Sequence, residues 1–382
     1  MLLVPCIRAP AITQESVESP GLTSFRQELR PRRRTLPEKT ARHGVYNMVG
    51  RDVGIDLGTC SVLVFVSGKG IVTREPSVVA KMVSTNRVIA VGDEAKRMLG
   101  RTPGDIAVIR PLRQGVITDF DVTLAMLKYF LHKSLRWFPP VRPRLLLAIP
   151  ASITHVERRA VLQAGKAAGG GRVYVMEEPI LAALGAGLDI SGASGHMVVD
   201  IGGGTTGIAV LSMREMVKDT STRVGGDALD EAVVRFVRRE YNLIIGDTTA
   251  EEAKIRAGSA VPKERKEFMV RGRDLVSGLP RSLVLDSFAL REAINEPLQT
   301  IGQAVRAVLD KTPPELLGDI IERGIVLTGG GALLEGIDEY ICTETGLAVH
   351  IADDPVSCVA KGTRVALENL DEYERHMKAI SA

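Results

Sequence analysis

Short apolar runs alternate with amphipathic segments along this chain. In RDVGIDLGTCSVLVFV, residues 51–66, two β-branched runs flank a Gly-Thr turn, which predicts a β-hairpin. In DFDVTLAMLKYFLHKSL, residues 119–135, apolar positions recur at helical spacing. One face of that helix contains Phe120, Leu124, Leu127 and Leu131. The run RLLLAIP at 144–150 predicts a buried strand.

Capping patterns indicate where several helices begin. Thr154-x-x-Glu157 and Thr249-x-x-Glu252 both match the capping box, and Pro179 fits the first turn of another helix. Strand–turn–strand and strand–turn–helix patterns follow at 196–213 and 323–341. This mixed order predicts an α/β protein in which helices cover the faces of layered sheets.

One pattern occurs twice in the chain. GIDLGT at 54–59 and VDIGGGT at 199–205 each combine an apolar strand, an aspartate near its end and a glycine turn. The two aspartates, Asp56 and Asp200, lie 144 residues apart. This spacing suits a duplicated domain whose two copies face each other across a cleft.

Glycine-rich turns follow apolar strands at 58–59, 202–204 and 329–331. Because glycine lets backbone N–H groups approach an anion closely, two such turns facing each other could hold a polyphosphate. Asp56 and Asp200 beside the phosphates would then need a cation, which predicts Mg²⁺ bound through water. A plain hairpin is the alternative for any one turn. No GxxxxGK[ST] is present, and GGGTTG fits a dinucleotide fold poorly because a strand-like segment follows it.

Charge separates an N-terminal segment from the rest of the chain. Residues 1–47 contain eight Lys/Arg and four Asp/Glu, so their net charge is +4. Since the whole chain has a net charge of +3, the remaining residues carry −1. Five prolines and the run RPRRR at 30–34 predict a disordered extension. The extension is either a solvated tail or an arm for an anionic partner. MVGRDVGIDLGT would make a complete N-terminus if translation began at Met48. The extension is therefore also interpreted as the result of a start codon assigned too far upstream.

The segment SLRWFPPVRPR at 134–144 contains the single tryptophan. Its prolines exclude a helix interior or a central strand, so Trp137 and Phe138 are predicted to lie in a surface loop. No acidic residue occurs between Asp121 and Glu157, whereas several basic residues do. The pair would either contact an anionic membrane surface or fold back onto its own domain.

These motifs resemble the MreB/Mbl family of bacterial actin-like cell-shape proteins. The resemblance extends from about Met48 to about Asn369 and includes VVDIGGGTTGIAV, RGRDLVSGLPR and KTPPELLGDIIERGIVLTGGGALLEGID. It implies an actin-like α/β fold, with duplicated RNase H-like domains of the actin/Hsp70/sugar-kinase superfamily and a nucleotide cleft between two domains. Domain I would comprise 48–189 and 359–382, and domain II would comprise 190–358.

The resemblance also implies a function. An ATP- and Mg²⁺-binding protein of this family would form homopolymeric filaments at the inner face of the cytoplasmic membrane and organise cell-wall elongation proteins, without a nucleic-acid partner. Trp137 and Phe138 align with the family's membrane-contacting loop. The alternatives are a small-molecule kinase, which would need a further general base, and an Hsp70-like ATPase, which would need an additional substrate-binding region.

Individual residues take roles from the resemblance. Glu178 would orient the attacking water and Thr205 would lie beside the γ-phosphate, as the catalytic residues. Asp56 and Asp200 would hold Mg²⁺ through water. The nucleotide contacts would be Gly58, Thr59, Cys60, Ser61, Gly202, Gly203, Gly204, Thr205, Glu251, Glu252, Lys254, Gly329, Gly330, Gly331 and Ala332.

Three positions depart from the family pattern. At residues 58–61 the family has GTAN, whereas this chain has Cys60 and Ser61 at the last two positions. A small residue at 60 preserves the space, and Ser61 has a hydroxyl in place of the amide. Gly207 stands where the family has an acid near the hydrolytic site. The resemblance therefore implies slow ATP hydrolysis coupled to polymerisation, with a rate that these substitutions leave open.

Overall fold

The structure, a computed structural model, describes residues 51–135 and 142–381. The N-terminal extension 1–47 and the pair Trp137 and Phe138 lie outside the described residues, so the predictions made for them stay predictions. Within the described residues no helix is long and apolar enough to cross a membrane.

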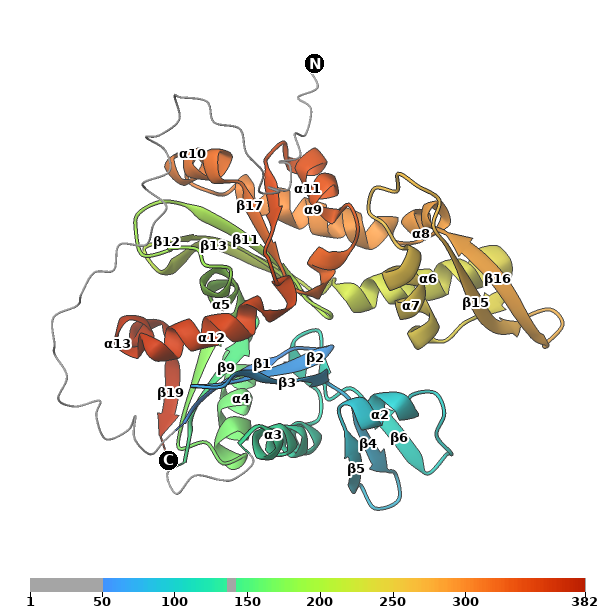
Figure 1. Cartoon of the computed structure of the whole chain (residues 1–382), viewed down its shortest axis with the longest axis horizontal. Coiled ribbons are helices and arrows are strands. Elements are labelled where there is room, and N and C mark those ends of the chain that lie inside the picture. The colour runs from blue at the N-terminus through green and yellow to red at the C-terminus, as the bar shows by residue number, and fades with distance from the viewer. Residues whose placement is uncertain (1–50, 136–141, 382) are drawn as a thin grey trace, which may run out of the picture. The chain divides into compact units, whose positions relative to one another are not determined.

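The first of two large sheets has six strands in the order β19-β10-β9-β1-β2-β3 (Figure 1). These are β1 (Asp52–Leu57), β2 (Ser61–Val66), β3 (Gly70–Pro76), β9 (Arg144–Ile149), β10 (Arg172–Glu177) and β19 (Lys378–Ser381). β1 pairs antiparallel with β2 and parallel with β9. The hairpin predicted at 51–66 and the buried strand predicted at 144–150 are thereby confirmed.

The second large sheet has five strands in the order β13-β12-β11-β17-β18. These are β11 (His196–Ile201), β12 (Thr206–Ser212), β13 (Glu215–Thr222), β17 (Ile325–Thr328) and β18 (Val349–Ile351). β11 pairs antiparallel with β12 and parallel with β17, which repeats the relations of β1 to β2 and β9. The order β3-β2-β1-β9-β10 thus occurs again as β13-β12-β11-β17-β18, as the repeated sequence pattern predicted.

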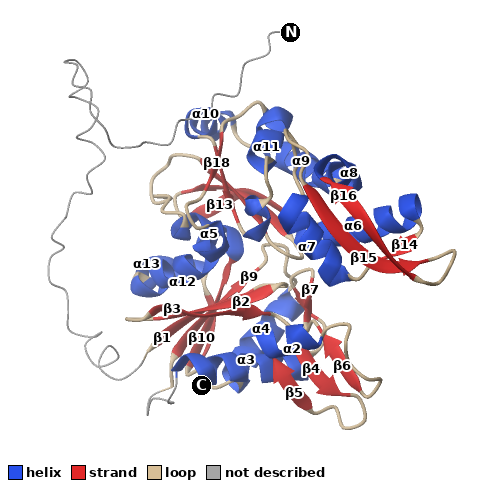
Figure 2. Ribbon diagram, turned by 45° about the vertical axis from the view of Figure 1, so that its right-hand side comes forward, coloured by secondary structure: helices blue, strands red, loops and turns tan. Residues whose placement is uncertain are grey.

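Helices fill the space between the two sheets and cover their outer faces. α5 (Glu178–Gly185) and α12 (Cys358–Glu368) lie between the sheets, where one apolar core joins them to strands of both (Figure 2). A Cβ atom added at Gly185 would lie 1.7 Å from the Cys358 carbonyl oxygen, and one at Gly362 would lie 1.9 Å from that of Leu181. Only glycine permits so close a helix pair at these two positions.

The outer faces carry the remaining large helices. α3 (Phe120–Leu135) and α4 (His155–Ala167) pack on the first sheet. The second sheet packs against α9 (Asn295–Leu309), α10 (Pro314–Arg323) and α11 (Ile337–Thr345), and α6 (Gly226–Tyr241) packs against α9. The short elements near the end of the described chain are η2 (Pro355–Ser357), α13 (Leu370–Tyr373) and η3 (Glu374–His376).

Each large sheet has a small three-stranded sheet attached. The first is followed by β4 (Val79–Met82), β5 (Val88–Val91) and β6 (Ile106–Ile109) with α2 (Asp93–Met98), and then by the pair β7 (Leu112–Arg113) and β8 (Val116–Ile117). The second carries β14 (Leu243–Ile244), β15 (Glu267–Asp274) and β16 (Pro280–Asp286) with α7 (Asp247–Ala257) and α8 (Ser287–Ala293). We call the first large sheet with its attached elements the first half, and the second the second half.

One local prediction is wrong. α7 begins at Asp247 after the N-cap Gly246, so Thr249 lies inside the helix and forms no capping box. In α3, Phe120 is exposed and Leu124 is only half-buried. The buried residues of α3 are Val122, Thr123, Met126, Leu127, Phe130, Leu131, Ser134 and Leu135. By contrast, the capping box of Thr154 and Glu157 is present at the start of α4.

The predicted domain boundaries stay a prediction. The first sheet takes its strands from 52–177 and 378–381, and the second takes its strands from 196–222 and 325–351.

Candidate functional site

A cavity of about 510 Å³ lies where the two halves face each other. Its walls include the first turn (58–61, between β1 and β2), the second turn (202–205, between β11 and β12) and the third turn (329–331, after β17). The structure therefore brings together the three glycine-rich turns that the sequence singles out, although they lie far apart in the chain.

The first and second turns contact each other directly. A Cβ atom added at Gly203 would lie 2.2 Å from Cys60 Sγ, and one at Gly204 would lie 2.6 Å from Thr59 Oγ1. Thr59 Oγ1 accepts a hydrogen bond from the Gly115 N–H at 3.1 Å. Any side chain at 203 or 204 would force the two turns apart, so the glycines here serve close approach and not a positive φ angle.

Hydrogen bonds from a neighbouring segment hold the first turn in place. Ser77 Oγ donates to the Gly58 carbonyl at 2.5 Å, and the Ser77 N–H donates to the Cys60 carbonyl at 3.0 Å. Ser77 follows β3 directly and is completely buried. Two carbonyl groups of the first turn are thus bonded to a segment outside it, which fixes its conformation.

Three of the carboxyl groups that line the cavity, those of Asp56, Glu178 and Asp200, have raised pKa values. Burial, and then the Asp200 carboxylate, raises the pKa of Asp56 to about 8. Burial raises the pKa of Asp200 to about 6, against a lowering effect of Thr328, whose Oγ1 donates to Asp200 at 2.7 Å. Burial, then Asp200 and Asp56, raises the pKa of Glu178 well above its ordinary value.

These acids fit a divalent cation. Asp200 raises the pKa of Asp56, and both raise that of Glu178, so negative charge is concentrated at this place. Mg²⁺ takes carboxylate and water oxygens. Within the described residues, no three His, Cys, Asp or Glu side chains are arranged as a direct metal cluster. A cation held here would consequently use ligands other than three such side chains, such as water or phosphate oxygens.

The two adjacent glutamates at the start of α5 have different surroundings. Glu177 forms an ion pair with Arg158 at 2.7 Å and is not part of the cavity wall. Glu178 does line the cavity, because it begins the helix where β10 ends. Of the two acids in EEP, the one interpreted as catalytic is thus the one that reaches the site.

Helix α7 contributes part of the predicted nucleoside contact. Glu251 and Lys254 line the cavity, whereas Glu252 is exposed and does not. Lys254 Nζ forms an ion pair with Asp230 at 2.8 Å and donates to the Gly226 carbonyl at 3.0 Å. Ala332 is completely buried behind the third turn and also lies outside the cavity wall. All other residues predicted to contact nucleotide line the cavity.

Several wall residues were not found from the sequence. They are Leu57, Gly115, Gly226, Leu229, Ile255, Arg256, Gly258, Lys266, Leu333, Leu334, Glu335, Pro355, Val356 and Val359. Ile255 and Leu333 are 69% and 64% exposed, so the cavity offers two apolar surfaces to a ligand. Ile255 was predictable, because it lies one helical turn after Glu251. Lys266, which forms an ion pair with Glu335, was not.

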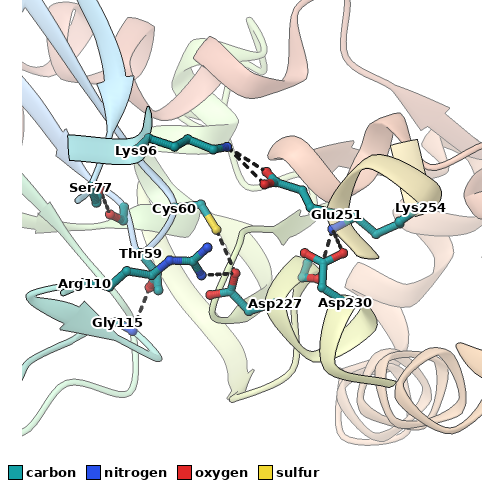
Figure 3. A network of polar contacts seen from close by, with 12 residues as sticks. Thr59, Cys60, Ser77, Lys96, Arg110, Gly115, Asp227, Asp230, Glu251 and Lys254 are labelled. Atoms are coloured by element: carbon teal, nitrogen blue, oxygen red, sulfur yellow. Dashed lines mark hydrogen bonds and ion pairs between the residues drawn. The ribbon is translucent and has the colours of Figure 1, made fainter. Parts of the chain in front are cut away.

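Polar contacts cross from the first half to the second beside the cavity (Figure 3). Arg110 Nη1 lies 2.7 Å from Asp227 Oδ1, and Lys96 Nζ lies 3.0 Å from Glu251 Oε2. Cys60 Sγ donates to the same Asp227 oxygen at 3.0 Å. None of Lys96, Arg110 and Asp227 lines the cavity.

Two sheets with the same strand order, facing each other across a cavity lined by paired glycine turns and acids, define the actin-like class of proteins. Solved structures of this class have the same fold. MreB5 of Spiroplasma citri bound to AMPPNP superposes with a TM-score of 0.81 at 38% sequence identity, over 85% of this chain and 98% of that one. The MamK double helical filament gives a TM-score of 0.70 at 21% identity, over 83% and 98%.

The chain belongs to the MreB/Mbl family. Residues 50–375 match the family described as MreB/Mbl protein. The cell shape-determining protein Mbl of Bacillus subtilis (strain 168) is 50% identical over 329 residues, which cover 86% of this chain and 99% of that protein. The cell shape-determining protein MreB of Escherichia coli (strain K12) is 50% identical over 332 residues, which cover 85% and 96%.

Proposed function

We propose that this protein binds ATP with Mg²⁺ in the cavity and forms filaments at the cytoplasmic membrane that organise cell-wall synthesis. The observation that carries the proposal is the pair of matched turns, each beside an aspartate that lines the cavity and in contact with the other turn. The relatives named cell shape-determining proteins support the cellular role, and the AMPPNP- and ADP-bound MreB5 structures support the nucleotide.

In this proposal the phosphates lie between the first and second turns. Backbone N–H groups at 58–61 and 202–205 would donate to phosphate oxygens, which need donors but no side-chain charge. The nucleoside would lie between α7 and the third turn, against Ile255 and Leu333. Glu251 and Lys254 would contact it from α7.

Asp56 and Asp200 would hold Mg²⁺ through water. When bound, the cation would neutralise phosphate charge and relieve the repulsion between the two carboxylates. Glu178 would orient the attacking water, because it is the cavity acid that begins a helix and faces both aspartates. Thr205 would lie beside the γ-phosphate.

Position 207 bears on the hydrolysis rate. Gly207 pairs with Asp200 in the β-ladder, and a Cβ atom there would lie 3.3 Å from Pro179 Cγ, beside Glu178. An acid at this position would thus add charge close to the proposed water site. Because this chain has glycine, we propose that Glu178 acts without that second acid and that hydrolysis is slow.

Filament formation, peripheral attachment to the inner face of the cytoplasmic membrane and contact with cell-wall elongation proteins complete the proposal. MamK, which has the same fold, forms a double helical filament. Membrane contact through Trp137 and Phe138 rests on the sequence alone, because these residues lie outside those described.

Sedimentation and electron microscopy test the proposal. The purified chain with ATP and Mg²⁺ should pellet and form filaments on an anionic lipid monolayer. The Asp200→Asn chain, which keeps the shape of the site but loses its charge, should remain in the supernatant. A wild-type chain that binds ATP but never sediments would contradict the filament assignment and favour a monomeric ATPase.

A further inference from the structure

Asp227 is the point at which three groups around the cavity meet. It is the second residue of α6. The Asp227 N–H donates to the Gly203 carbonyl at 2.8 Å, and the Gly226 N–H donates to the Gly202 carbonyl at 3.0 Å. Asp227 is therefore fixed to the backbone of the second turn. Its carboxylate also lies at a helix N-terminus, where negative charge is favourable.

From the first half, Arg110 and Cys60 reach the same carboxylate oxygen. Arg110 Nη1 is 2.7 Å from Asp227 Oδ1, and the pair is mostly buried, with 29% and 23% of the two side chains exposed. The Cys60 thiol is 3.0 Å from that oxygen. Burial, and then the charge of Asp227, raises the pKa of Cys60 to about 12, so the thiol stays protonated and donates.

Cys60 belongs to the first turn, so these bonds join the two turns that would enclose a phosphate chain (Figure 3). Moving the turns apart would break the bond of Cys60 to Asp227, and moving the two halves apart would also break that of Arg110. Lys96 and Glu251 form a second bridge between the halves at 3.0 Å, on α2 and α7. The bridge of Lys96 and Glu251 involves neither of the two turns.

We propose that Asp227, with Arg110 and Cys60, forms a tie between the two turns that sets how fast a bound nucleotide leaves. The inference rests on the proposed function, since it takes the ligand to be a nucleotide held between the turns. A ligand so held leaves only from the separated state, and its dissociation rate rises in proportion to the population of that state. Arg110 and Asp227 are thus positioning residues and do not touch the ligand.

Dissociation of a fluorescent ATP analogue with Mg²⁺, chased with excess ATP, tests the tie. Arg110→Glu places two carboxylates together, and dissociation should become about tenfold faster, as expected for loss of a partly buried ion pair. The double variant Arg110→Glu with Asp227→Arg exchanges the two charges, and its dissociation rate should return most of the way to that of wild type. Cys60→Ala should give a smaller acceleration, because the charged contact remains.

Arg113→Glu is the matched control. Arg113 is exposed, lies three residues after Arg110 and undergoes the same change in charge. Its variant should release the analogue at the wild-type rate. Should Arg110→Glu fail to fold, as judged by circular dichroism, Arg110→Gln removes the charge without reversing it and should still accelerate release. Equal dissociation rates in a folded Arg110 variant and the wild type would overturn the tie.

Alkylation of Cys60 by iodoacetamide, followed by peptide mass spectrometry, measures separation of the turns without any nucleotide. Separation frees the thiol from Asp227, so Cys60 should react several-fold faster in Arg110→Gln than in wild type or Arg113→Glu. If the wild type binds no ATP analogue, the proposed function fails while this measurement still decides the tie. Equal alkylation rates in all three chains would reject it.

Discussion

At the residue scale, Glu177 and Glu178 allow a direct comparison of two neighbouring acids. Glu178→Gln should leave the affinity for ATP and Mg²⁺ close to wild type but slow phosphate release by about 10²-fold, because a water-orienting group acts mainly in the transition state. Glu177→Gln is the control, since Glu177 is paired with Arg158 away from the cavity. Single-turnover phosphate release measures both. Equal rates in wild type and Glu178→Gln would give Glu178 a purely structural role.

The raised pKa of Asp56 predicts an unusual pH dependence for the chain free of nucleotide and metal. The pKa of Asp56 is raised from 3.8 to about 8, so between these values the folded chain keeps a proton that the unfolded chain has lost. The free energy of unfolding should therefore fall as the pH rises through this interval, by at most about 1.4 kcal/mol per pH unit for each such proton. Asp56→Asn should flatten the fall.

Thermal unfolding in the presence of a chelator, at several pH values between about 5 and 8, tests this dependence. All other titrating groups are shared by wild type and Asp56→Asn, so the difference between their slopes isolates Asp56. Parallel slopes in the two chains would show that Asp56 is ionised in the folded protein throughout. Adding Mg²⁺ and ATP should stabilise the wild type most at the upper end of the range.

The site residues that sequence reasoning found share one property: each lies in or beside a glycine turn at the end of an apolar strand, so a local pattern identifies it. Arg110, Asp227 and Lys266 lie in no such pattern. Their positions depend on contacts between segments distant in sequence, such as the 117 residues that separate Arg110 from Asp227. Glu252 shows the reverse error, since a residue next to Glu251 on a helix faces about 100° away from it.

At the scale of elements, two capping patterns give a matched pair of substitutions. Thr154→Ala should lower the free energy of unfolding by about 1 kcal/mol, because Thr154 accepts from the Glu157 N–H and the Glu157 side chain bonds back to Thr154. Thr249→Ala should change it by less than about 0.5 kcal/mol, because Thr249 lies inside α7 and alanine favours helix. Chemical denaturation measures both, and equal losses would mean that Thr249 has a capping role.

Helices and strands were predictable from sequence wherever the hydrophobic spacing fitted only one type of element, as in β1, β2 and β9. α3 shows why this was not always enough. Apolar residues occur around most of its circumference, so the spacing that picked out Phe120 and Leu124 competes with the one that includes Val122 and Met126. The sheet on which α3 packs decides between them, and no local pattern records which face meets that sheet.

At the scale of the whole molecule, the repeated strand order predicts that both halves contribute alike to nucleotide binding. Asp56→Ala and Asp200→Ala should each weaken binding of ATP with Mg²⁺ by about tenfold or more, because each removes a carboxylate from the same cation. Titration calorimetry with and without Mg²⁺ measures this. The increase in ATP affinity that Mg²⁺ causes should be smaller in both variants than in wild type. If Mg²⁺ still raises the affinity of one variant as it does in wild type, the cation is held by the remaining aspartate alone.

The place of β19 in the first sheet has a consequence for how the protein is made. β19 pairs antiparallel with β10 at the edge of that sheet, and α12 packs against α5, although both partners precede them by about half the chain. The five strands of the second sheet, in contrast, all come from one continuous segment. As the chain leaves the ribosome, the second half has all its strands and helices available first. The first half, although it begins earlier, must wait for its closing helix and strand, with a sheet edge left open during translation.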